Sequence, residues 1–140
     1  MSLKDSSLYL TGLAHMASSY SKTMGPSYME IGCYQTKNFK EEFSKDYSIP
    51  QNQIKIKETT ESVETIIEAI LGKELVEGFL YWLQMEAGEA KRVFIPEDDS
   101  SITSLLCWSE GGKTSFYFVE DVFFIECEKM TICMIIGNNE

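Results

Sequence analysis

The chain has 140 residues, of which 44% are hydrophobic and 12% aromatic, and its formal net charge is −10. A chain of this length normally forms one domain around one core, and this hydrophobic content excludes disorder caused by weak burial and charge repulsion. We therefore expect one folded domain over residues 1–140.

The negative charge is concentrated in one part of the chain. Residues 1–57 carry seven Lys or Arg and five Asp or Glu, whereas residues 58–140 carry five and seventeen, a net charge of −12. A negative potential repels phosphate backbones and anionic lipid headgroups, and it accelerates association with cationic surfaces. The charge therefore favours a basic protein partner over nucleic acid or a membrane.

The first predicted element is an N-terminal helix. Leu10, Leu13, Ala14 and Ala17 have the spacing that gathers residues on one helical face, and the segment Met24-Gly25-Pro26 would end the helix. The stretch His15-Met16-Ala17-Ser18 resembles a cloning scar, so residues 1–18 need not all be native.

Three shorter elements follow. Residues 28–34 are aromatic, β-branched or sulfur-bearing and predict a strand. Residues 38–47 predict a short helix, because Phe39 and Phe43 lie four positions apart. Residues 53–57 alternate apolar and polar side chains, the pattern of a half-buried strand.

The most regular pattern in the chain predicts a helix that begins after Thr60, a residue type favoured at helix N-caps, and ends at Gly72. Five apolar residues fall on one face of it: Val63, Ile66, Ile67, Ile70 and Leu71. Glu61, Glu64 and Glu68 fall on the opposite face, and Glu61 lies in the first turn, where the helix dipole favours an anion.

After this helix the apolar pattern shortens toward a period of two and predicts three hairpins. They pair residues 76–86 with 91–95, 102–109 with 114–119, and 122–127 with 130–136. Residues 75–83 also fit the helical period, but their aromatic content and Gly78 favour a strand. Helices early and hairpins late predict an α+β domain, with the helices of the first half packed on one face of a mainly antiparallel sheet built from the C-terminal hairpins.

Few catalytic chemistries fit the residue types present. His15 is the only histidine, and no phosphate-binding glycine loop exists. Cys127 and Cys133, the closest cysteine pair, are separated by five residues rather than by the two of a typical zinc site. Carboxylates are abundant, but a metal site needs ligands that converge from several elements. We expect no enzymatic activity, no metal and no cofactor.

The four cysteines are better explained as free thiols than as disulfides. Cys33, Cys107 and Cys133 each lie within an apolar run, and no secretory signal precedes them. No apolar run approaches the length that spans a bilayer. These features predict a cytoplasmic protein.

Three acidic groups are the candidate binding residues. They are the Glu61, Glu64, Glu68 stripe, the loop Glu97-Asp98-Asp99, and Glu120, Asp121 and Glu126 on the late strands. If they share a face, they form a patch that mimics phosphate spacing and fits the basic cleft of a nucleic-acid enzyme. Alternatively they are scattered solubilising charges. Trp82, Trp108 and Tyr117 are aromatic interface candidates if they face outward, and are otherwise core residues of the sheet.

In size, acidity, reduced cysteines, α+β layout and lack of catalytic motifs, the chain resembles the immunity proteins of bacterial toxin–immunity systems, including contact-dependent inhibition systems. The resemblance implies tight binding of a basic toxin domain, a nuclease in our interpretation, with its active site covered. It is one of general character and transfers no functional residue. Two alternatives remain: a phage- or plasmid-type inhibitor or DNA mimic of a host nucleic-acid enzyme, and a small-ligand or structural domain.

Overall fold

A computed structural model of the chain describes residues 27–98, 102–107 and 118–138. The elements in these ranges follow in the order β1 (Ser27–Tyr34), η1 (Thr36–Asn38), α2 (Phe39–Tyr47), η2 (Gln51–Gln53), β2 (Ile56–Glu58), α3 (Val63–Leu71), α4 (Lys73–Ala87), β3 (Ala90–Pro96), α5 (Ile102–Leu106), β4 (Phe118–Cys127) and β5 (Thr131–Asn138). The expected N-terminal helix and the residues Asp99, Trp108 and Tyr117 lie outside the described ranges.

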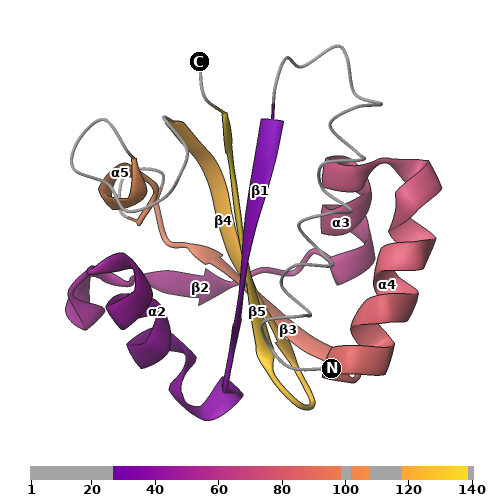
Figure 1. The fold of residues 1–140 in the computed structure, drawn as a ribbon, viewed down its shortest axis with the longest axis horizontal. Helices are drawn as coiled ribbons and strands as arrows, with labels where there is room; N and C mark the ends of the chain where they lie inside the picture. The colour runs from indigo at the N-terminus through magenta and orange to yellow at the C-terminus, as the bar shows by residue number, and fades with distance from the viewer. Residues whose placement is uncertain (1–26, 99–101, 108–117, 139–140) are drawn as a thin grey trace.

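The strands form one sheet in the order β1-β5-β4-β3-β2, and every neighbouring pair is antiparallel (Figure 1). Strands β4 and β5 form the centre and are joined by a tight turn, in which the Cys127 amide donates to the Met130 carbonyl at 2.9 Å. The predicted α+β class with an antiparallel sheet is therefore confirmed, as are the C-terminal hairpin, the strand at β1 and the helix at α2.

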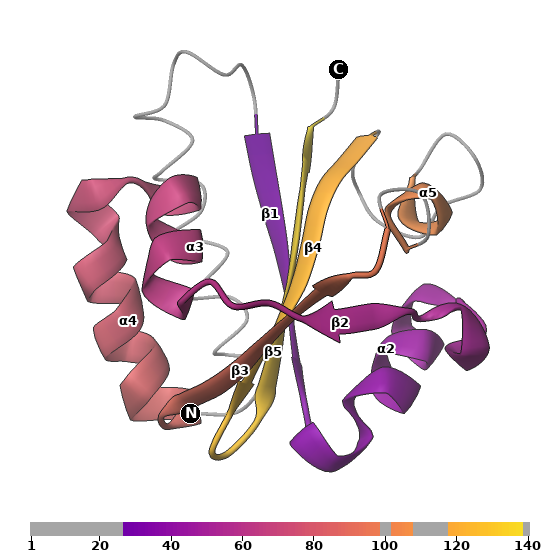
Figure 2. The ribbon, with the colours of Figure 1, turned by 180° about the vertical axis from the view of Figure 1, so that it is seen from behind.

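Helices cover both faces of this sheet, not one as we expected. Figures 1 and 2 show α3 and α4 on one side and α2 and α5 on the other. Along β4, Phe123 and Ile125 pack in the cluster with α3 and α4, whereas Val122 and Phe124 pack in the cluster with α2 and α5. Because successive side chains of a strand point to opposite faces, the central strands are apolar on both sides.

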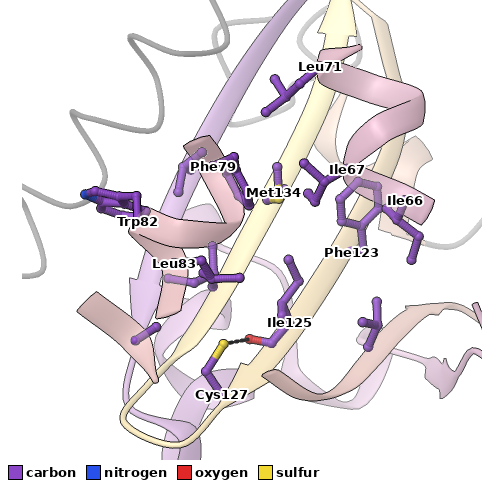
Figure 3. Packing of buried hydrophobic residues seen from close by; sticks show 14 of the residues in the cluster. Ile66, Ile67, Leu71, Phe79, Trp82, Leu83, Phe123, Ile125, Cys127 and Met134 are labelled. Atoms are coloured by element: carbon purple, nitrogen blue, oxygen red, sulfur yellow. Dashed lines mark hydrogen bonds between the residues drawn. The ribbon is translucent and has the colours of Figure 1, made fainter. Parts of the chain in front are cut away.

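The first cluster is the larger one and holds α3 and α4 against β4 and β5 (Figure 3). Three side chains of the cluster have no exposed surface: Ile67, Phe79 and Ile125. The side chain of Met134, on β5, points from the sheet toward the two helices. Burial of each such side chain contributes about 1.5–3 kcal/mol. Packing of this cluster fixes the position of α3.

Residues 76–86 belong to the helix α4, so the first arm of the first predicted hairpin is wrong, whereas its second arm, residues 91–95, lies in the strand β3. Val76, Phe79 and Leu83 are buried at helical spacing, while Tyr81 and Met85 are 69% and 60% exposed on the opposite side. This amphipathic pattern outweighs the single glycine inside the segment, which costs a helix about 1 kcal/mol relative to Ala.

The first arm of the second predicted hairpin is also wrong, because residues 102–106 form the short helix α5. Ile102 and Leu106 are fully buried in the cluster with α2, and their four-residue spacing places both on one helical face. The rest of this predicted hairpin lies mostly outside the described residues.

Two predicted boundaries differ from the structure. Helix α3 begins at Val63 with Ser62, not Thr60, as its N-cap, and the Ser62 hydroxyl accepts a hydrogen bond from the Thr65 amide at 3.2 Å. Glu61 therefore precedes the helix instead of lying in its first turn. The strand expected at residues 53–57 is displaced to Ile56–Glu58, and η2 precedes it.

Candidate functional site

A groove of about 510 Å³ lies between α3 and the end of the sheet where β3 ends and β4 begins. Its described lining comes from the segment before α3, from α3 itself, from the end of β3, from α5 and from β4. The residues are Thr59, Glu61, Thr65, Ile66, Ala69, Ile70, Ile95, Pro96, Asp98, Thr103, Asp121 and Phe123. The volume is in the range of ordinary ligand pockets.

The groove brings together one member of each predicted acidic group. Glu61 comes from the segment before α3, Asp98 from the segment after β3, and Asp121 from β4. The described lining contains no Lys or Arg. Three carboxylates that are distant in the sequence thus share one concave surface.

A β-bulge places Asp121 on this surface. In the β4–β5 register Val119 pairs with Gly137 and Asp121 with Ile136, so β4 carries one extra residue, Glu120. Val119 packs on the α2 and α5 side. Simple alternation would place Asp121 on that side too, but the bulge moves it to the face of Phe123, which lines the groove. Bulges that redirect a side chain are common next to functional sites.

The floor of the groove is apolar and its rim is held by backbone hydrogen bonds. Ile66 and Phe123 are buried, and Ile70 and Ile95 are half-buried. At the rim, the Thr59 amide donates to the Val93 carbonyl at 2.9 Å. The segment that carries Glu61 is thereby tied to β3.

The other predicted acidic residues do not line this groove. Glu64 and Glu68 are exposed on α3, and Glu97 is exposed, with its amide donating to the Lys55 carbonyl at 3.0 Å. Glu120 is the extra residue of the bulge, and its side chain and Asp99 lie outside the described part of the structure.

Glu126 has a structural partner on the neighbouring strand. Its carboxylate accepts from Arg92 Nε at 2.6 Å and from Arg92 Nη2 at 2.9 Å, and the Arg92 guanidinium lies 5.2 Å from the centre of the Phe94 ring. The hydrogen bonds and charge of Arg92 lower the pKa of Glu126. This pair links β3 to β4, and Glu126 does not contribute to the groove.

No protein-family model matches the chain, and neither the curated proteins nor the solved structures contain a significant match.

A second hollow of about 600 Å³ adjoins the groove and shares Thr59 and Glu61 with it. Lys91 and Arg92 line this second hollow. Glu61 thus lines both the acidic groove and the second hollow, whose lining has mixed charge.

Sequence reasoning missed the uncharged part of the groove. Thr65 and Ile70 lie on α3 beside the acidic stripe, and no pattern distinguishes them from ordinary helix residues. Among the predicted aromatic residues, Trp82 is 7% exposed and belongs to the core. Tyr81 and Met85, which were not predicted as surface residues, are the most exposed large apolar side chains of the described structure.

The cysteines are free thiols, with Cys127 and Cys133 buried and Cys33 and Cys107 half-buried. Burial raises the pKa of Cys33 to about 11 and that of Cys127 to about 12, so neither is a ready nucleophile at neutral pH. Within the described ranges, no set of three His, Cys, Asp or Glu residues is arranged to hold a metal ion. The described helices also include none that is long and apolar enough to cross a membrane.

Proposed function

We propose that the protein is an acidic inhibitor that binds a basic protein, and that it acts as an immunity protein against a nuclease toxin domain. The observation that carries the proposal is the groove that Glu61, Asp98 and Asp121 line together, with no Lys or Arg in its described lining. A nuclease holds its substrate through Lys and Arg that contact phosphates, and such a surface is complementary to clustered carboxylates.

Electrostatics on the surrounding surface support the same partner. Glu64 and Glu68 are exposed on α3, next to the groove, and extend the negative surface beyond it. Concave sites with apolar walls focus the field of the charges that line them and can raise association rates by about 10–1,000-fold. Because the Debye length is about 8 Å at physiological salt, this attraction acts at short range and weakens as salt is added.

Affinity capture from the native host, followed by binding titrations in increasing salt, tests the proposal. A basic toxin domain whose affinity falls as salt rises is the expected result. Capture of a host nucleic-acid enzyme would assign the protein to the phage- or plasmid-type inhibitors instead. A partner that is not basic, or an affinity that does not change with salt, would contradict the electrostatic mechanism.

Charge reversal locates the interface on the protein. Replacing Glu61, Glu64 and Glu68 by Lys changes the net charge as much as the same replacement of Glu41, Glu77 and Glu89, which are exposed and do not line the groove. We expect the first variant to associate with the partner at least about tenfold more slowly than the second at low salt. Equal association rates would remove the α3 surface from the interface.

A further inference from the structure

We propose that the outer face of α4 is a docking surface for a basic protein, in which Gly78 forms a notch that receives an apolar side chain of that partner. The inference rests on the proposed function only for the identity of the partner. It depends on three features of α4: an exposed apolar pair, a glycine that the fold does not require, and the acidic surroundings of both.

The apolar pair consists of Tyr81 and Met85, which are 69% and 60% exposed. They lie four residues apart on α4 and therefore share one helical face. This face points away from the sheet, because Val76, Phe79 and Leu83 are buried on the opposite side of the helix, and α4 is an outer helix in Figures 1 and 2. Tyr and Met are enriched in protein interfaces, and Tyr is frequent among the residues that dominate binding energy.

Gly78 is exposed one turn before Tyr81 and leaves a notch beside its ring. A glycine inside a helix costs about 1 kcal/mol relative to Ala. Neither sterics nor backbone geometry requires it in the described structure, since a Cβ at Gly78 would have nothing within 4 Å and the φ of Gly78 is not positive. A glycine lets another molecule approach the backbone closely, and binding surfaces retain residues that cost stability. The notch therefore suits an incoming side chain.

The charges around this face favour a basic partner. Residues 63–87, which form α3 and α4, contain five Glu and one Lys. Only Gly72 joins the two helices, which lie side by side, so Glu64 on α3 is at about the level of Tyr81 on α4 (Figure 1). A second copy of this chain, whose net charge is also −10, and an anionic lipid surface would both be repelled. A segment with Lys or Arg around an apolar residue would be attracted.

The experiment uses the full chain, labelled with ¹⁵N, and three short, capped, alanine-based helical peptides. The first carries Lys and has Leu on one face, the second has Ala in place of Leu, and the third keeps Leu but has Glu in place of Lys. We expect the first peptide to shift the amide signals of Gly78, Tyr81 and Met85 in a saturable manner. The second should bind there at least about fivefold more weakly, and the third should leave these signals unchanged.

Gly78→Leu separates binding from stability. Leu has a higher helix propensity than Gly, so this variant should be at least as stable as the native protein, yet its side chain fills the notch and should weaken binding of the first peptide about tenfold or more. Tyr81→Ala with Met85→Ala should weaken binding similarly. Leu105→Ala removes another exposed apolar side chain, on α5, and should leave binding unchanged. Unchanged or tighter binding by Gly78→Leu would overturn the inference.

Sedimentation velocity of the protein alone tests the competing occupant. We expect a monomer, because the net charge opposes self-association. A dimer that Gly78→Leu dissociates would assign the face to a second copy and overturn the inference.

The two proposals can fail separately. If the first peptide produces no localised shift on α4 but a basic partner is still captured in a salt-dependent manner, the docking surface is refuted and the inhibitor proposal stands. If the peptide binds on α4 but the captured partner is not basic, the docking surface stands and the inhibitor proposal is refuted.

Discussion

Gly32 of β1 lies directly beneath the ring of Tyr34, and adding a single methyl group there should destabilise the fold. A Cβ at Gly32 would lie 2.6 Å from Tyr34 Oη and 2.8 Å from Tyr34 Cζ, closer than real Cβ contacts. Tyr34 is 4% exposed and donates a hydrogen bond to Asp46 Oδ2 at 2.9 Å. Overpacking costs about 1–3 kcal/mol, and loss of the hydrogen bond adds about 1 kcal/mol. We therefore expect Gly32→Ala to cost about 2–4 kcal/mol.

Urea unfolding of a double-mutant cycle measures this value. At a slope of about 2 kcal/mol per M, a loss of this size lowers the unfolding midpoint by about 1–2 M. In the Tyr34→Ala background the clashing ring is absent, so Gly32→Ala should be neutral or stabilise the strand slightly. If Gly32→Ala costs the same free energy in both backgrounds, contact with Tyr34 is not the cause and the reasoning is refuted.

Three further substitutions test other features of the fold by the same unfolding assay. Burial raises the pKa of the Glu30 carboxyl, although the Tyr47 hydroxyl donates a hydrogen bond to it. The stability of the folded state should therefore fall as the pH rises from the ordinary carboxyl pKa of 4.5 through the raised pKa. The Glu30→Gln variant should therefore become more stable relative to the native protein as the pH rises through that window. A difference in unfolding free energy that is the same at all pH values would contradict this. Gly78→Ala should stabilise α4 by about 1 kcal/mol, because Gly78 is exposed and nothing lies within 4 Å of the added methyl group. A loss of stability would contradict this prediction. Arg92 lowers the pKa of Glu126, so this carboxylate stabilises the fold above its unfolded pKa and loses that effect as pH falls through the lowered value. Glu126→Gln should flatten the acid limb of the stability profile, and an unchanged limb would contradict the pairing.

The central hairpin could be predicted from the sequence, and so could the burial of both its faces. Residues 122–125 and 132–136 are continuous apolar runs without alternation. A strand with one solvated face alternates apolar and polar side chains, whereas a continuous run is typical of a strand covered on both sides. Our prediction of helices on one face did not use this signal, and the structure places α2 and α5 on the second face.

The errors concern segments in which two periods compete. Residues 73–87 combine helical spacing of Val76, Phe79 and Leu83 with aromatic residues that favour strands and a glycine that disfavours a helix. Residues 102–106 are too few for the period to be decided, because a short apolar run is compatible with a strand or a buried helix. In both segments tertiary packing determines the outcome: the side that meets the sheet is the helical apolar face.

The acidic groups could be predicted, but their convergence could not. Which acidic residues line the groove together depends on the antiparallel pairing of β3 with β4 and on the position of α3 over the same end of the sheet. It depends also on the bulge at Glu120, since removal of one residue there would direct Asp121 to the opposite face. None of these features has a local signature that distinguishes Asp98 from Glu97, or Glu61 from Glu64.

The concentration of like charge has opposite consequences for stability and for binding. A net charge of −10 destabilises the compact state through self-repulsion, and the convergence of carboxylates at the groove adds to it. Raising salt from about 0.01 M to 0.15 M shortens the Debye length from about 30 Å to about 8 Å and screens this repulsion. We therefore expect the urea midpoint to rise over this range while affinity for the basic partner falls. If both quantities fell together, or if stability did not change with salt, the acidic surface would not be under the electrostatic strain that the proposed function implies.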